Sequence, residues 1–223
     1  MTTTHVHKNQ PILHQGPALD QTSRAVILLH GRGSSARTMI PLAEELSTEG
    51  VSFLIPQAAK SRWYPETAFG PLKDNEPDFS SALQRISEII QEVTAVGISR
   101  ERIYLGGFSQ GACLAAEYTA RNAARYGGLF VLSGALIGPP DAPRAYPGSL
   151  QGTPVFIGCS DVDPWIPQAL VQQTGEVLQA LDGRVDLRTY GGMGHTINRE
   201  EILAVRNMLQ AEIREQQPPD GRR

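Results

Sequence analysis

The chain has 223 residues, 40% of them hydrophobic, and a formal net charge of -3. This length is enough for one large core, the charge gives no basic footprint for nucleic acid, and no apolar run reaches the ~18 residues of a membrane span. The N-terminus lacks the charged-then-apolar pattern of a secretory signal, and only two cysteines occur, Cys113 and Cys159. Both features favour a cytoplasmic protein with reduced thiols.

Residues 1–22 are polar and predict an irregular N-terminal arm. His5, His7 and His14 lie in it, and a His-x-His pair could touch a metal ion. Because no further ligand lies nearby, we expect a solvated arm and no metal site. Residues 215–223 are expected to form a flexible C-terminal tail.

Apolar runs and amphipathic segments alternate between these ends. Runs typical of buried strands occupy residues 25–29, 51–56, 103–105, 128–134 and 154–159, and an alternating strand is expected over 185–190. Helical spacing covers residues 39–46, 79–96, a segment directly after 109, 169–181 and 200–213. This α/β order predicts a single domain over 23–214, with a mostly parallel central sheet and helices on both faces.

Residues 107–111 read GFSQG, between a predicted strand and an alanine-rich helix. G-x-S-x-G in this context is the sharp turn that exposes a nucleophilic serine, here Ser109. Side chains at Gly107 and Gly111 would collide with the turn or with the neighbouring strand. A chance match in a loop is the alternative, and the flanking strand and helix argue against it.

A serine nucleophile needs a base and a group that orients the base. The order Ser109, Asp163, His195 matches the α/β-hydrolase triad, and His195 is the only histidine after Ser109. Asp161 competes with Asp163, and their spacing alone does not separate them. We favour Asp163, because Pro164 fixes the backbone after it and Asp161 is suited to capping the turn.

The early loop after residues 25–29 reads HGRGSS. In this fold such a loop supplies one oxyanion donor and the residue after the nucleophile supplies the other, which points to the backbone N–H groups of Arg32 and Gln110. His30 is expected to have a structural role. The Arg32 side chain is either solvated or reaches over the site, where it would favour an acidic substrate.

Four stretches, GFSQGA at 107–112, LLHGRGS at 28–34, DVDPWIP at 161–167 and GMGH at 192–195, resemble the phospholipase/carboxylesterase family of serine α/β-hydrolases, which includes acyl-protein thioesterases. The resemblance covers about residues 25–213. It implies Ser109 as nucleophile, His195 as base, Asp163 as orienting acid, and the amides of Arg32 and Gln110 as oxyanion donors. Arg32 and the run at 63–65 differ from the thioesterase pattern.

We therefore expect a serine carboxylic-ester hydrolase that acts on small to medium acyl esters through an acyl-enzyme, without a cofactor. Alternatives are an acyl thioesterase or lysophospholipase on the same triad, or a low-turnover binding sensor with this fold. The loop between residues 134 and 154 is too short for a separate lid domain, so an open pocket is expected. Exposed aromatic residues beside such a pocket would suit a homodimer. Candidate substrate contacts, each of which could also be ordinary packing, are Trp63, Tyr64, Phe69, Trp165 and Met193.

Overall fold

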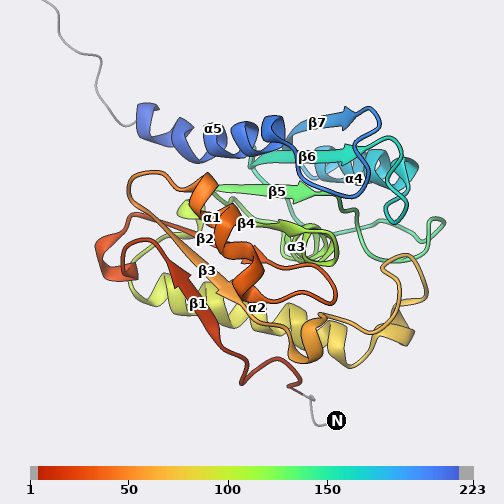
Figure 1. Ribbon diagram of the computed structural model, residues 1–223, viewed down its shortest axis with the longest axis horizontal. Helices are drawn as coiled ribbons and strands as arrows, with labels where there is room; N and C mark the ends of the chain where they lie inside the picture. The colour runs from red at the N-terminus through yellow and green to blue at the C-terminus, as the bar shows by residue number, and fades with distance from the viewer. Residues whose placement is uncertain (1–4, 216–223) are drawn as a thin grey trace, which may run out of the picture.

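A twisted central sheet organises the protein, as the computed structural model shows (Figure 1). Within residues 5–215, the part of the chain that the structure describes, seven strands pair in the order β1-β3-β2-β4-β5-β6-β7. Only β1 and β3 are antiparallel, and all other neighbours are parallel. The strands are β1 (Ile12–Gln15), β2 (Arg24–Leu29), β3 (Val51–Pro56), β4 (Ile103–Phe108), β5 (Gly128–Leu132), β6 (Pro154–Ser160) and β7 (Arg184–Tyr190).

Helices cover both faces of the sheet because the central strands are apolar on both faces. In β2, Ala25, Ile27 and Leu29 pack into one buried cluster with α2, α3 and α4, and Val26 and Leu28 pack into another with α1 and α5. The expected α/β-hydrolase fold with a mostly parallel sheet is confirmed. The helices are α1 (Ile40–Leu46), α2 (Asp78–Ala95), α3 (Gln110–Arg121), α4 (Gln168–Ala180) and α5 (Arg199–Glu215), and short 3-10 helices lie at Leu19–Gln21, Ala36–Met39, Ala59–Ser61, Leu72–Asn75 and Arg100–Arg102.

The irregular, solvated arm expected over residues 1–22 is contradicted at two places in its described part, the strand β1 and the buried His7. β1 adds an edge strand to β3, with Leu13 opposite Ile55. His7 is fully buried against α2 and the loop after β3, and its backbone N–H donates to the Ser81 hydroxyl. Residues 1–4 of the arm and 216–223 of the expected tail lie outside the described residues.

Parallel strands bring their carboxyl ends to one edge of the sheet. The HGRG loop follows β2, Ser109 follows β4, Asp163 follows β6 and His195 follows β7, so four distant parts of the chain meet there. Between β5 and β6 the described chain contains no separate lid domain.

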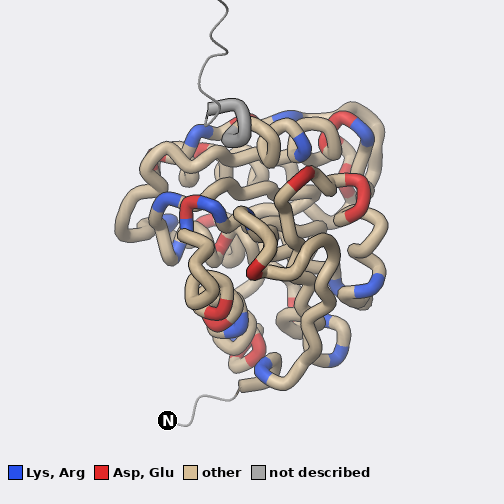
Figure 2. The backbone as a smooth tube through the Cα atoms, turned by 90° about the vertical axis from the view of Figure 1, so that its left-hand side faces the viewer, with Lys and Arg blue, Asp and Glu red and all other residues tan. Residues whose placement is uncertain are grey.

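The surface of the described chain carries both signs of charge. In the view of Figure 2, basic and acidic positions are interspersed along the backbone. Among the described helices, none is both long enough and apolar enough to cross a membrane.

Candidate active site

The turn at Ser109 exposes this side chain at the end of β4. Ser109 has φ of 55° and ψ of -122°, a left-handed conformation that a residue with a side chain seldom adopts and that is found at functional turns. A Cβ at Gly107 or Gly111 would lie 2.5 or 2.3 Å from the Leu29 carbonyl oxygen. The predicted collision with the neighbouring strand is therefore confirmed, and the two glycines let α3 begin directly behind Ser109.

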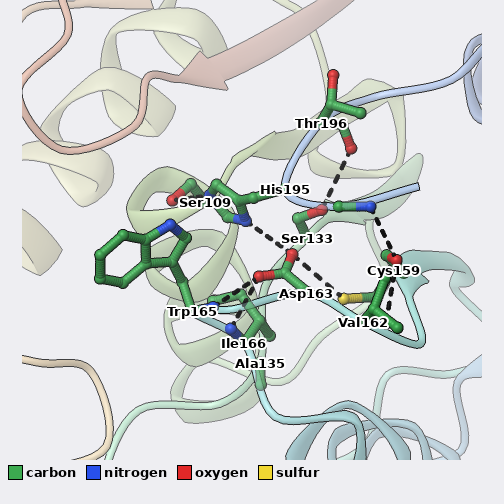
Figure 3. Close-up of polar contacts among 12 residues, drawn as sticks. Ser109, Ser133, Ala135, Cys159, Val162, Asp163, Trp165, Ile166, His195 and Thr196 are labelled. Atoms are coloured by element: carbon green, nitrogen blue, oxygen red, sulfur yellow. Dashed lines mark hydrogen bonds and ion pairs between the residues drawn. The ribbon is translucent and has the colours of Figure 1, made fainter. Parts of the chain in front are cut away.

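Ser109, His195 and Asp163 form a continuous hydrogen-bonded chain (Figure 3). The distance from His195 Nε2 to Ser109 Oγ is 2.8 Å, and that from His195 Nδ1 to Asp163 Oδ2 is 2.7 Å. The Asp163 side chain is completely buried and the His195 side chain is partly buried. The Phe108 ring packs against the imidazole with centroids 4.9 Å apart. Since an ionised carboxylate only accepts hydrogen bonds, Nδ1–H donates to Asp163 and the Nε2 lone pair faces Ser109.

Asp163 is held in place by its own loop. Its Oδ1 accepts hydrogen bonds from the backbone N–H groups of Trp165 at 2.9 Å and Ile166 at 3.0 Å. The Cys159 thiol donates a longer hydrogen bond, of 3.8 Å, to Asp163 Oδ2. Burial, and to a smaller extent the nearby Asp163 charge, raises the pKa of this thiol to about 12. Cys159 therefore stays protonated and remains a donor.

The competing carboxylate has a different partner. Asp161 Oδ1 accepts the backbone N–H of Gly192 at 2.7 Å, which ties the loop after β6 to the loop that carries His195. The Ser160 hydroxyl makes a second such tie by accepting the Gly194 N–H at 3.1 Å. Asp161 thus holds the backbone of the His195 loop, and Asp163 contacts the imidazole.

The two candidate oxyanion amides flank Ser109. A Cβ on Gly31 would lie 3.4 Å from the Ser109 Cβ, so the HGRG loop passes close to the hydroxyl. The Gly33 N–H donates to the Ser61 carbonyl, whereas no described residue accepts a hydrogen bond from the Arg32 N–H. Gln110 is the first residue of α3, where a backbone N–H has no acceptor within the helix.

The Gln110 side chain ties α3 to the loop after β3. Its Oε1 accepts the Trp63 N–H and its Nε2 donates to the Tyr64 carbonyl, both at 2.8 Å, in a nearly buried position. These bonds fix the start of α3, and with it the Gln110 amide, relative to the loop.

Two buried histidines hold the same loop from the other side. The Ala59 N–H donates to His7 Nδ1 and the Ala58 N–H donates to His30 Nε2, each at 3.0 Å. The other nitrogen of each ring therefore carries the proton. His7 Nε2–H donates a hydrogen bond to the Trp63 carbonyl at 3.0 Å, and His30 Nδ1–H donates one to the Gly31 carbonyl at 2.8 Å. Burial lowers the pKa of both rings, so both stay neutral. His30 has the expected structural role, whereas the role of His7 has no signature in its local sequence.

A pocket of about 560 Å³ opens at Ser109. Of the five candidate substrate contacts, Tyr64, Phe69 and Trp165 line it, and Trp165 is 71% exposed at the surface. Four further lining residues were not predicted from the sequence, because they are buried or small and belong to no chemical motif: Thr67, Ala68, Cys113 and Ile166. The full lining is Arg32, Tyr64, Thr67, Ala68, Phe69, Ser109, Gln110, Cys113, Trp165, Ile166 and His195.

Trp63 and Met193 are not among the residues that line this pocket. Trp63 is fully buried, and its indole N–H donates to the His30 carbonyl at 2.9 Å, so this ring belongs to the core. Met193 lies outside the pocket lining, with its sulfur accepting a hydrogen bond from the Asn198 amide at 2.9 Å. Cys113 lines the pocket, yet burial raises the pKa of its thiol to about 11, so it stays protonated.

The fold and the hydrogen-bonded Ser-His-Asp chain are those of a serine hydrolase of the α/β-hydrolase class. The sequence model of the Phospholipase/Carboxylesterase family matches residues 17–213, and the chain belongs to this family. It is an ester-hydrolysing enzyme, as the motifs predicted.

Individual relatives agree with this assignment. Acyl-protein thioesterase 1 of Kluyveromyces lactis is 31% identical over 206 residues, covering 82% of this chain and 89% of the thioesterase. A crystal structure of a phospholipase/carboxylesterase from Dyadobacter fermentans is 38% identical with a TM-score of 0.87, covering 93% of this chain and 99% of that one. The Bacillus cereus carboxylesterase, at 21% identity and a TM-score of 0.72 over 92% and 95% of the two chains, shares the fold.

Proposed function

We propose that this enzyme hydrolyses small to medium acyl esters through an acyl-enzyme on Ser109, with His195 as the base and Asp163 as the orienting acid. The observation that carries the proposal is the unbroken hydrogen-bonded chain from Ser109 Oγ through both imidazole nitrogens to the buried Asp163 carboxylate. This arrangement lets a hydroxyl lose its proton as it attacks a carbonyl.

The reaction then has two halves. In the first, His195 Nε2 takes the Ser109 proton while Oγ attacks the ester carbonyl, and the imidazolium gives that proton to the departing alkoxide as the C–O bond breaks. In the second, His195 takes a proton from water, which attacks the acyl carbonyl, and the proton returns to Ser109 as the acid leaves. Asp163 keeps Nδ1–H in place and stabilises the imidazolium in both halves.

The amides of Arg32 and Gln110 are the proposed donors to the tetrahedral oxyanion. Each flanks Ser109, and neither has an acceptor among the described residues that would compete with the substrate. Loss of one such donor lowers kcat by on the order of a hundredfold or more.

The lining of the pocket is consistent with a bound acyl group. Its walls are mostly apolar, with Phe69, Tyr64, Trp165 and Ile166 beside Ser109. Apolar walls of this kind stabilise a bound acyl chain by removing its surface from water.

Thioester hydrolysis on the same triad is the second candidate. It is supported by the relatives, because acyl-protein thioesterase 1 from Kluyveromyces lactis aligns with 82% of this chain. A thioester presents the same carbonyl to Ser109 and needs the same oxyanion donors.

The test is hydrolysis of a p-nitrophenyl ester series from acetate to palmitate, with the matching acyl thioesters in parallel. We compare the wild-type protein with Ser109→Ala, and with Ser80→Ala as a control at an exposed serine of α2. We expect kcat/KM to peak at short or medium acyl chains and to vanish only in Ser109→Ala. A peak at long chains with faster thioester turnover would favour the second candidate, and full activity of Ser109→Ala would contradict the serine mechanism.

A further inference from the structure

The Arg32 side chain is exposed and lines the pocket beside Ser109. The two terminal nitrogens of its guanidinium donate to the carbonyl oxygens of Pro65 and Glu66, in the loop that forms one wall of the pocket. A guanidinium has five N–H donors, so these two bonds leave donors that the loop does not use. The same bonds hold the planar group in place, which lowers the ordering cost of binding a ligand.

Arg32 also gives the pocket an uncompensated positive charge. No Asp or Glu is among the residues that line the pocket, and no described carboxylate forms an ion pair with Arg32. The Asp163 side chain is buried next to His195 and is not part of the lining.

The charge of Arg32 reaches the inner wall of the pocket. Burial raises the pKa of the Tyr64 hydroxyl well above its ordinary value, and the Arg32 charge acts in the opposite direction. Tyr64 lies next to the residues that Arg32 holds and lines the same pocket.

From this geometry we propose that the preferred substrates are esters or thioesters that carry a free carboxylate, which Arg32 binds while Ser109 attacks the acyl carbonyl. The inference rests on the proposed function and adds the substrate class. The fixed, planar fork of Arg32 suits the two oxygens of a carboxylate, and the apolar lining suits the short chain that joins the two ends of the substrate.

Matched pairs of esters test the charge without changing the carbon skeleton. Monomethyl glutarate and dimethyl glutarate place a charged or a neutral group on the acyl side, and butyryl glycolate and its methyl ester do so on the alcohol side. For each pair the readout is the ratio of kcat/KM for the charged ester to that for the neutral ester, obtained by chromatography of the released acids. The pair with the higher ratio identifies the side that carries the carboxylate.

We expect a ratio above one in the wild-type protein for at least one pair. Arg32→Met should lower that ratio by roughly tenfold or more, the usual size of a hydrogen bond to a charged group, and Arg32→Lys should keep part of it. Arg37→Met is the matched control, because it removes one exposed arginine from the same region outside the pocket lining and should leave the ratio unchanged. High salt should lower the wild-type ratio.

Binding of glutarate separates this inference from the hydrolytic mechanism. Glutarate should bind the Ser109→Ala protein in calorimetry, and Arg32→Met in that background should weaken binding by roughly tenfold. Ratios of one or below for both pairs, with the neutral esters still hydrolysed, would overturn the Arg32 assignment and leave the serine mechanism intact. Glutarate binding that is absent, or that Arg32→Met does not weaken, would do the same. Turnover that survives Ser109→Ala would overturn the proposed function instead.

Discussion

Replacing Asp163 by Asn should inactivate the enzyme while leaving its fold intact. The Oδ1 position accepts two backbone N–H groups, from Trp165 and Ile166, and only the amide oxygen of Asn can accept them. The Asn NH2 group therefore occupies the Oδ2 position, 2.7 Å from His195 Nδ1. There it donates to Nδ1 and forces the imidazole proton onto Nε2, which faces Ser109.

A proton on Nε2 removes the base, because the lone pair that should accept the Ser109 proton is gone. The imidazolium that forms during attack also loses its carboxylate partner. The expected loss in kcat is about 10⁴-fold, which corresponds to about 5 kcal/mol of transition-state stabilisation. Because both Oδ1 bonds remain, the free energy of unfolding should fall by no more than about 1 kcal/mol.

The assay combines steady-state hydrolysis of p-nitrophenyl butyrate with urea unfolding. Asp161→Asn is the matched control: its side-chain oxygen still accepts the Gly192 N–H, so its kcat should remain within a few-fold of wild type. A larger loss in Asp161→Asn than in Asp163→Asn would mean that Asp161 orients the base. An Asp163→Asn protein that loses activity only because it unfolds in less urea would refute the tautomer argument.

Three further predictions concern the groups that hold the site. Gln110→Leu leaves the buried Trp63 N–H and Tyr64 carbonyl unpaired, so urea titration should show a loss of roughly 2–4 kcal/mol, and an unchanged midpoint would contradict this. Burial lowers the pKa of His7 and His30 below 6.5, so the unfolded chain binds protons first and the free energy of unfolding should fall as the pH drops below about 6.5. His7→Gln should flatten that slope by up to about 1.4 kcal/mol per pH unit, and an identical slope would refute the role of His7. Gly111→Ala places a methyl group 2.3 Å from the Leu29 carbonyl oxygen and should lower the Tm or prevent folding, which circular dichroism measures.

The central strands could be predicted from the sequence because their signal is local. Residues 51–56 are apolar at every position except Ser52, and β3 has those bounds because both of its faces are buried. β1 was missed because it has only two apolar residues, Ile12 and Leu13, and exists through its antiparallel pairing with β3 about 40 residues further along the chain.

The chain of Ser109, Asp163 and His195 could be anticipated because each residue lies in a loop that follows a strand of the parallel part of the sheet. Parallel strands bring such positions to one edge whatever the loops do. The surroundings could not be anticipated in the same way. Trp63 looked like a substrate contact on a loop, and its burial follows from bonds to His30 and Gln110, which lie far from it in the sequence.

The central claim is that Ser109 forms an acyl-enzyme, and intact-protein mass spectrometry tests it most directly. The wild-type protein is mixed with excess p-nitrophenyl butyrate and quenched in acid within the first turnovers, and the labelled peptide is then sequenced. We predict one added butyryl group, located on Ser109 and absent in Ser109→Ala. An acyl group on another residue, or none in a protein that continues to turn over the ester, would contradict the mechanism.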